Sequence, residues 1–312
     1  MGKVICPGEL LIDFICTDHD QSLKQGMTFI KKAGGAPANA AVAIQKMGAE
    51  AYVLSCVGND QFGEYLIDVL NGYNVNTTCI SKNSDFHTTL AFVSLESSGE
   101  RDFSFNRGAD EKYSIDMINQ QPLNDAEVFH FGSATAFLGG ELRDTYYYLL
   151  NYAIKNNKII SVDPNYREAL FGNNKSLFIK NTLSFIKHAD LLKVSDMEAK
   201  LLTNEVSVGE AARTLNKLGA KYVLVTLGRE GTLISSLEKQ IKVSVEPVKM
   251  VDATGAGDAF IGSVLADISS DVSLTFDKLI DYVTFANKVG AMTVQSYGAL
   301  ESVPYKKDVT GN

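Results

Sequence analysis

The stretch VDATGAGDAF, residues 251–260, sets two glycines and two aspartates in a segment that is otherwise rich in apolar residues. It runs directly into DAFIGSVLADI, residues 258–268, which has the periodicity of an apolar helical face. On that face three apolar residues recur at a spacing of four: Phe260, Val264 and Ile268. The pattern therefore predicts that the glycine turn is the start of a helix.

The start of a helix is a natural binding site for an anion, because its first amides have no partner within the helix and lie at the positive end of the dipole. Gly255 and Gly257 let the backbone approach a ligand closely. Asp258, in the first turn, would lie beside that anion and could accept a proton from a hydroxyl that attacks a phosphate. A plain turn with a dipole-complementing aspartate remains the alternative at this point.

Two common nucleotide-binding loops do not fit this stretch. No Gly-Lys-Ser/Thr follows the glycines, so it is not a Walker A loop. Phe260 occupies the third glycine position of the dinucleotide-binding fingerprint. A nucleotide, if one binds, must bind in another way.

Away from this stretch, short apolar strands alternate with helix-length segments, as in KYVLVTLG at 221–228. This alternation predicts an α/β fold, a three-layer sandwich with a mostly parallel central sheet. Two segments, about 11–33 and 88–108, lack helical periodicity and resemble strands joined by polar turns. We expect them to form a small antiparallel β lid inserted into a single domain, residues 1–312.

Composition excludes several classes of protein. The net charge of −8, without a basic stripe, argues against a nucleic-acid partner. No apolar run is long enough for a membrane helix, and the N-terminus lacks the basic start of a secretory signal. The four cysteines have no metal-binding spacing, which favours buried thiols in a reducing compartment. We expect a soluble cytoplasmic protein.

A second motif, AGGAPANAAVAIQKMG at 33–48, again places paired glycines before a helix. The amides of Gly34 and Gly35, with the side chain of Asn39, could hold sugar hydroxyls, although close packing of helix on sheet explains the glycines equally well. Asp13 lies in the apolar run LLIDFIC, where a carboxylate is costly unless it is paired or used. We interpret Asp13 as a site residue.

These residues resemble the ribokinase-like (PfkB) carbohydrate kinases along almost the whole chain. The two signature regions of the family are similar to GGAPANAAVAIQKMGAEAYVLSCVGNDQFG (34–63) and DATGAGDAFIGSVLA (252–266). GGAPAN, GERDFSFNRGAD and DPNYR together resemble the bacterial fructokinase branch most closely. The resemblance implies transfer of the γ-phosphoryl group of ATP to a primary hydroxyl of a sugar, and fructose to fructose 6-phosphate is the preferred reaction.

The resemblance also implies roles for individual residues. Asp258 would be the general base, and the backbone from Thr254 through Gly255, Ala256 and Gly257 would form the anion hole. Sugar-binding positions of the family match Asp13, Gly34, Gly35 and Asn39. Arg107 would reach across the sugar, and Arg167 would approach the transferring phosphoryl group; a solvated surface charge is the alternative for each arginine.

On the nucleotide side, the resemblance implies a set of contacts to ATP from Ser195, Glu198, Thr226, Gly228, Gly231, Thr254 and Asn287. Ser195 and Glu198 also fit a capping box that needs no ligand. Mg²⁺ would be held largely by ATP and by water near Glu198. The family further suggests a K⁺ site built from Asp252, Thr254, Gly298 and Ser302, and pairing of two lids in a homodimer.

Several other functions compete with this interpretation. Among kinases, 2-keto-3-deoxygluconate would suit the two arginines, and ribose or a nucleoside comes third because the lid segments show no clear aromatic sandwich for a base. A nicotinamide-dependent oxidoreductase is disfavoured by the missing third glycine. A catalytically inactive sugar-binding regulator is disfavoured because Asp258 and both glycines are retained.

Overall fold

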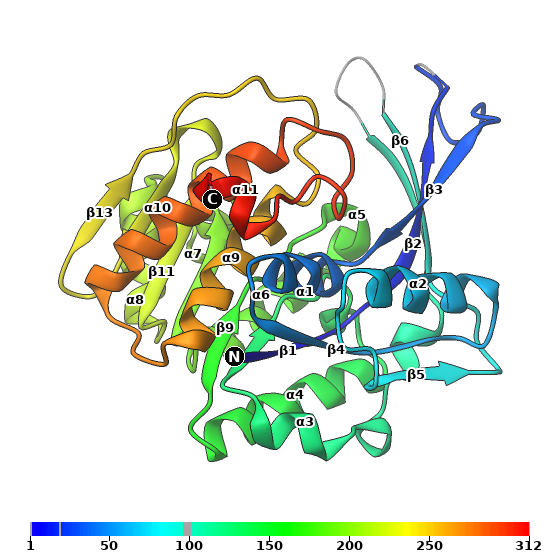
Figure 1. Ribbon diagram of the computed structural model, residues 1–312, viewed down its shortest axis with the longest axis horizontal. Helices are drawn as coiled ribbons and strands as arrows, with labels where there is room; N and C mark the ends of the chain where they lie inside the picture. The colour runs from blue at the N-terminus through cyan, green and yellow to red at the C-terminus, as the bar shows by residue number, and fades with distance from the viewer. Residues whose placement is uncertain (1, 19, 96–100, 312) are drawn as a thin grey trace.

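The computed structural model describes residues 2–18, 20–95 and 101–311 and contains two β-sheets (Figure 1). The larger sheet has nine strands in the order β13-β12-β11-β10-β9-β8-β1-β4-β5. Its seven strands from β11 to β5 are parallel, and β12 and β13 add an antiparallel edge. The strands are β1 (Lys3–Pro7), β4 (Glu50–Gly58), β5 (Ile80–Asn83), β8 (Val128–Phe131), β9 (Ile159–Val162), β10 (Leu191–Ser195), β11 (Tyr222–Thr226), β12 (Thr232–Ser235) and β13 (Gln240–Val243).

Helices cover both faces of this sheet. One apolar core lies under α1, α2, α9 and α10, and the other lies under α3, α4, α6, α7 and α8. Strand β11 shows why, because Leu224 enters the first core while Val223 and Val225 enter the second. The three-layer α/β sandwich predicted from the apolar strands is confirmed.

The helices that form the two outer layers are α1 (Ala36–Lys46), α2 (Gln61–Gly72), α3 (Gln120–Asp125), α4 (Glu141–Lys155), α6 (Lys175–Ile186), α7 (Asp196–Thr203), α8 (Val208–Lys217), α9 (Ala256–Ser270) and α10 (Phe276–Thr293). Two short helices, α5 (Glu168–Phe171) and α11 (Lys306–Thr310), complete the set. Within the described part of the chain, none of the helices combines the length and the apolar character that a bilayer crossing requires.

The smaller sheet has the order β3-β2-β6-β7 and rises beside α2 (Figure 1). Its strands are β2 (Leu11–Cys16), β3 (Phe29–Gly34), β6 (Leu90–Leu95) and β7 (Arg101–Asn106), so the small sheet expected from segments 11–33 and 88–108 is confirmed. Residues 19 and 96–100 of those segments lie outside the described residues. The two outer pairs are antiparallel, whereas the central pair β2–β6 is parallel, because it joins strands from two separate excursions of the chain.

The order of the large sheet places a switch point between β1 and β8. From β1 the chain progresses through β4 to β5 on one side, and from β8 through β9 and β10 on the other. In open α/β sheets, ligands bind at such a point, outside the carboxyl ends of the strands. The residues that follow β1, β8, β9 and β10 are therefore the ones to examine for a site.

Candidate active site

The predicted helix start at 255 is confirmed. Gly255 caps α9 in the left-handed region with φ 76°, and a Cβ on it would lie 2.8 Å from the Cα of Ala299. Only glycine fits this position without strain. The amide of Ala256 donates to the carbonyl of Ala253 at 3.3 Å, so this predicted member of the anion hole already has a backbone partner. The turn nevertheless directs the open end of a 15-residue helix toward the site.

Asp258 is buried in the first turn of α9, with 7% of its surface exposed. Its Oδ2 accepts a hydrogen bond of 2.9 Å from the Nδ2 of Asn39 in α1. Burial raises the pKa of the Asp258 carboxyl, and the charge of Lys193, the bond from Asn39 and the charge of Arg167 oppose that rise. The carboxyl is desolvated, and its three neighbours favour the charged form that a general base needs.

Asp13 and the paired glycines lie together at the base of the smaller sheet. A Cβ on Gly34 would lie 2.0 Å from the Oδ2 of Asp13, and Gly35 has φ 109°. Burial raises the pKa of Asp13 to about 6, against the opposing charge of Arg167. Arg167 thus acts on Asp13 and on Asp258, so the structure brings these three predicted residues and Asn39 into one neighbourhood.

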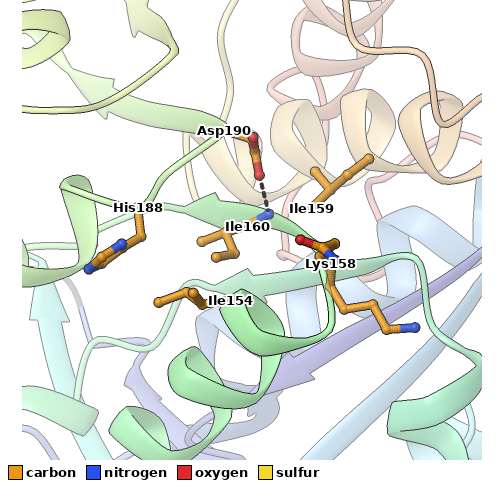
Figure 2. Close-up of a pocket in the computed structure, with 7 residues that line it drawn as sticks. Ile154, Lys158, Ile159, Ile160, His188 and Asp190 are labelled. Carbon is orange, nitrogen blue, oxygen red and sulfur yellow. Dashed lines mark hydrogen bonds between the residues drawn. The ribbon is translucent and has the colours of Figure 1, made fainter.

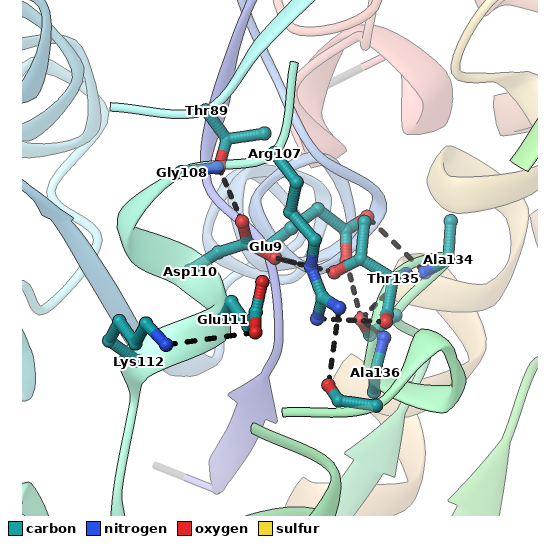
Figure 3. Close-up of polar contacts among 12 residues, drawn as sticks. Glu9, Thr89, Arg107, Gly108, Asp110, Glu111, Lys112, Ala134, Thr135 and Ala136 are labelled. Atoms are coloured by element: carbon teal, nitrogen blue, oxygen red, sulfur yellow. Dashed lines mark hydrogen bonds and ion pairs between the residues drawn. The ribbon is translucent and has the colours of Figure 1, made fainter. Parts of the chain in front are cut away.

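The sequence analysis missed a buried polar network at the switch point, drawn in Figure 3. Glu9, only 1% exposed, follows β1 and accepts from the amide of Ala36 at 3.1 Å and from the Oγ of Ser133, after β8, at 2.5 Å. Thr135 links Glu9 to a second buried carboxylate, Asp110, with distances of 3.5 and 2.8 Å. This network ties the loop that opens α1 to the loop that follows β8.

Arg107 belongs to the same network and does not point freely toward a ligand (Figure 3). Its guanidinium donates to Asp110 at 3.4 Å and to the carbonyls of Thr135 and Gly139 at 3.1 Å each. Thr89, at the start of the lid, also donates to Asp110. Arg107 therefore anchors the lid segment, and its contact with the sugar stays a prediction.

A second feature that the sequence analysis missed is a buried ion pair. The Nζ of Lys193, in β10, lies 2.8 Å from the Oδ2 of Asp163, which follows β9. Both side chains are almost completely buried, with exposed fractions of 7% and 0%. The only signal in the sequence was a single lysine inside the apolar run ADLLKVS.

The predicted capping box of Ser195 and Glu198 is present at the start of α7. Glu198 uses its other carboxylate oxygen, Oε1, to accept from the amide of Tyr166 at 2.7 Å. The side chain of Glu198 is buried, and its bond to Tyr166 fixes the segment that carries Arg167. Among the described residues there is no cluster of three His, Cys, Asp or Glu side chains that would hold a metal ion directly. That Mg²⁺ is held by ATP and by water near Glu198 stays a prediction.

The predicted nucleotide residues fall into two groups. Thr226 ends β11, and Gly228 and Gly231 form the turn after it, with φ 56° and 92°. Asn287, in α10, uses its amide within the protein: its Oδ1 accepts from Thr232 at 2.8 Å and its Nδ2 donates to the carbonyl of Val243 at 3.1 Å. A contact of the Asn287 side chain with adenine stays a prediction.

The four residues of the predicted cation site lie together. The carboxylate of Asp252 accepts from Thr254 through its amide, at 2.9 Å, and through its hydroxyl, at 2.6 Å. Its other oxygen accepts from the amide of Gly298 at 3.1 Å, and the hydroxyl of Ser302 donates to the carbonyl of Gly298. One carboxylate with carbonyl and hydroxyl oxygens is a hard donor set that fits K⁺.

Two hollows lie outside the group formed by Asp13, Asn39 and Asp258. One, of about 340 Å³, is at the amino end of β9 and is lined by Lys158, Ile160, His188 and Asp190 (Figure 2). There the carboxylate of Asp190 accepts from the amide of Ile160 at 2.9 Å. The other, of about 720 Å³, lies between α7, α8 and the β12–β13 edge and borders Gly228. Neither contains Asp258 or Asp13.

Comparisons with known proteins agree with this geometry. A model of the pfkB family of carbohydrate kinases matches residues 1–306. The chain is similar to fructokinase-1 of Zea mays, with 36% identity over 311 residues that cover 98% of this chain and 96% of the relative. It is similar in structure to a fructokinase from Vibrio cholerae O395 bound to fructose, ADP and calcium, with 26% identity, a TM-score of 0.87 and coverage of 100% and 98%. An uncharacterized sugar kinase from Pyrococcus horikoshii in complex with ATP is 33% identical, with a TM-score of 0.87 and coverage of 99% and 97%.

Proposed function

The chain belongs to the pfkB family of carbohydrate kinases, and on that premise we propose that it transfers the γ-phosphoryl group of ATP to the 6-hydroxyl of D-fructose. The observation that carries the proposal is the contact of Asn39 with Asp258. It joins the predicted sugar-binding helix to the predicted base at the open end of α9. Fructose is favoured because the relatives from Zea mays and Vibrio cholerae are fructokinases.

In this mechanism Asp258 takes the proton of the sugar hydroxyl. The oxygen then bonds to the γ-phosphorus while the bond to the bridging oxygen breaks, and ADP leaves with that electron pair. The backbone from Thr254 through Gly255 and Ala256 to Gly257 offsets the charge that develops on the phosphoryl oxygens. Glu198 would hold Mg²⁺ through water when the ion is bound with ATP, and the ion would supply further positive charge to offset the phosphates.

The sugar would lie between the lid and the large sheet. Asp13, Gly34, Gly35 and Asn39 supply acceptors and donors for its hydroxyls. Arg167, which is exposed and whose charge acts on both Asp13 and Asp258, would lie over the sugar and the transferring group. Arg107 supports this region by anchoring the end of lid segment 88–108.

On the nucleotide side, we infer that Ser195, Thr226, Gly228, Gly231 and the backbone near Asn287 line the path of ATP. K⁺ would bind at Asp252, Thr254, Gly298 and Ser302. A cation there would stabilise the turn that precedes α9, because Asp252 and Thr254 lie directly before Gly255. The proposed role of K⁺ is therefore to order the anion hole.

We infer that residues 1–312 act as one kinase unit, with segments 11–33 and 88–108 as a lid that closes over the sugar and excludes water. The lid carries exposed apolar side chains, with Met27 at 88% and Ile30 at 45% exposure. This supports pairing of two lids in a homodimer. The acidic charge and the buried, unpaired thiols support a cytoplasmic enzyme without nucleic-acid or membrane partners.

A second substrate, 2-keto-3-deoxygluconate, is favoured by one observation: the exposed guanidinium of Arg167 could bind its carboxylate. A coupled assay of ADP formation with fructose, 2-keto-3-deoxygluconate, ribose and adenosine tests the proposal. We expect kcat/KM for fructose to exceed that for the others. Turnover of the keto acid with none for fructose would replace the substrate, and turnover of no sugar at all would overturn the kinase proposal.

A further inference from the structure

Among the residues that the structure describes, Lys193 is the one buried cation beside the proposed phosphate site that the mechanism above does not use. It lies in β10 with its neighbours Leu192 and Val194 fully buried. Its ammonium has three N–H donors, and one of them bonds to Asp163 at 2.8 Å. Within residues 2–18, 20–95 and 101–311, no other acceptor bonds to this ammonium. Two donors of a buried charged group are thus left for a ligand.

The position of that ammonium is set by Gly257, the second residue of α9. A Cβ on Gly257 would lie 2.9 Å from the Nζ of Lys193, so the glycine leaves room for the lysine at the open end of the helix. A cation at the positive end of a helix dipole is unfavourable by itself. It becomes favourable when an anion binds between the ammonium and the helix amides.

The charges around Lys193 keep it protonated, as binding of an anion beside it requires. Burial disfavours its charged form, but the carboxylates of Asp163, Glu198 and Asp258 outweigh burial and hold its pKa above the usual range. Arg167 is the other cation that faces Asp258. The second oxygen of Asp163, Oδ1, is buried without a partner. A purely structural link between β9 and β10 would be served as well by apolar side chains, since buried ion pairs add little net stability.

We propose that Lys193 is a further catalytic residue, whose ammonium, held by Asp163 against Gly257, donates to an oxygen of the phosphoryl group while that group moves from ATP to the sugar. The proposal rests on the proposed kinase function. No proton leaves Lys193 in this step, because it acts as a fixed positive charge. Asp163 is a positioning residue that orients the ammonium.

The decisive variants are Lys193→Met and the double variant Asp163→Asn with Lys193→Met. The single variant leaves Asp163 buried without its counter-ion, which is enough to unfold a protein, whereas the double variant leaves no unpaired charge. For both we would measure kcat, the melting temperature, the affinity for fructose, and the affinity for ADP with aluminium fluoride in the presence of fructose. Lys82→Met, which removes an exposed partner of Glu64, is the matched control.

We expect the double variant to fold and to bind fructose within about twofold of wild type, while kcat and the affinity for ADP–aluminium fluoride each fall by about 100-fold. Lys82→Met should match wild type in every measurement. If the double variant retains wild-type kcat and affinity for ADP–aluminium fluoride, Lys193 is structural and the inference is wrong. That result differs from failure of the proposed function, in which the wild-type protein itself would phosphorylate no sugar.

Discussion

The Nδ2 of Asn39 donates to the Oδ2 of Asp258 across 2.9 Å, although the two residues are 219 positions apart in the chain. Each belongs to one of the two motifs that the sequence analysis singled out. The bond leaves Asn39 Oδ1 buried without a partner, so an acceptor remains next to the proposed base. A sugar hydroxyl that donates to Asn39 Oδ1 would lie next to Asp258, which links recognition of the sugar to its deprotonation.

Replacing Asp258 by Asn should remove the base and keep the shape of the site. We expect kcat to fall by about 10³-fold, within the range for loss of a general base, while the dissociation constant for fructose changes little. Steady-state kinetics with calorimetric binding of fructose measure both quantities. Asp277→Asn, at an exposed carboxylate on α10, is the control. A variant Asp258→Asn with near-normal kcat would refute the assignment.

Activity should fall on the acid side at an unusually high pH. Burial raises the pKa of Asp13 to about 6 and also raises that of Asp258, and both must be ionised to accept protons. The activity is therefore full above these pKa values and is lost as the pH falls through them. We expect log kcat/KM for fructose to decline below about pH 6, where Asp13 becomes protonated, and to decline more steeply where Asp258 is protonated as well. A profile that stays flat to about pH 4.5, near the ordinary aspartate range, would contradict this.

Gly255→Ala should damage both stability and catalysis. Alanine is strained at φ 76°, and its Cβ would meet the backbone of Ala299. We expect a loss of about 1–2 kcal/mol in the free energy of unfolding, together with lower kcat because the amides of α9 shift. Gly72→Ala is the matched control, since a Cβ at this helical glycine meets nothing within 4 Å. Denaturant titration should place Gly72→Ala at or slightly above wild type.

Glu9→Ala should be among the most destabilising single changes. It would leave the amides of Ala36 and Ala134 and the hydroxyl of Ser133 without their buried acceptor. We expect the free energy of unfolding to drop by about 3 kcal/mol. Glu238→Ala, at an exposed turn, should change it little. Equal unfolding free energies for the two variants would show that the network contributes nothing.

Exchange of the monovalent cation tests the loop that precedes α9. We expect kcat to be several-fold higher in KCl than in tetramethylammonium chloride at equal ionic strength, because the large organic ion cannot enter a site of oxygen donors. Asp252→Ala should abolish this difference. Asp271→Ala, at an exposed carboxylate paired with Lys278, should preserve it. Identical activity in both salts would remove the cation site from the mechanism.

Local patterns were sufficient for much of the fold. The spacing of Phe260, Val264 and Ile268 correctly predicted a helix after the glycine turn, because amphipathic periodicity records which side of a helix is buried. The pairing of β2 with β6 could not be predicted in the same way. It depends on how two excursions of the chain meet, which no local periodicity encodes.

The site was predicted where glycines and aspartates interrupt apolar runs, as at Gly255 and Asp13. It was missed where a charged residue pairs inside the protein, as at Glu9, Asp163 and Lys193. The sequence alone does not show whether the ammonium of a lysine in an apolar strand contacts solvent, an aspartate or a ligand. Arg107 illustrates the converse, since its interpretation as a sugar contact overlooked Asp110 as its partner.

The burial of helix α1 affects how the protein folds during its synthesis. Every residue of α1 except Gln45 is buried, and much of its cover comes from α9, near the end of the chain. During translation of the middle of the chain, the apolar surface of α1 therefore stays exposed to solvent. A newly made chain would present that surface to chaperones until its last third emerges, so premature termination should yield insoluble fragments and no partly active enzyme.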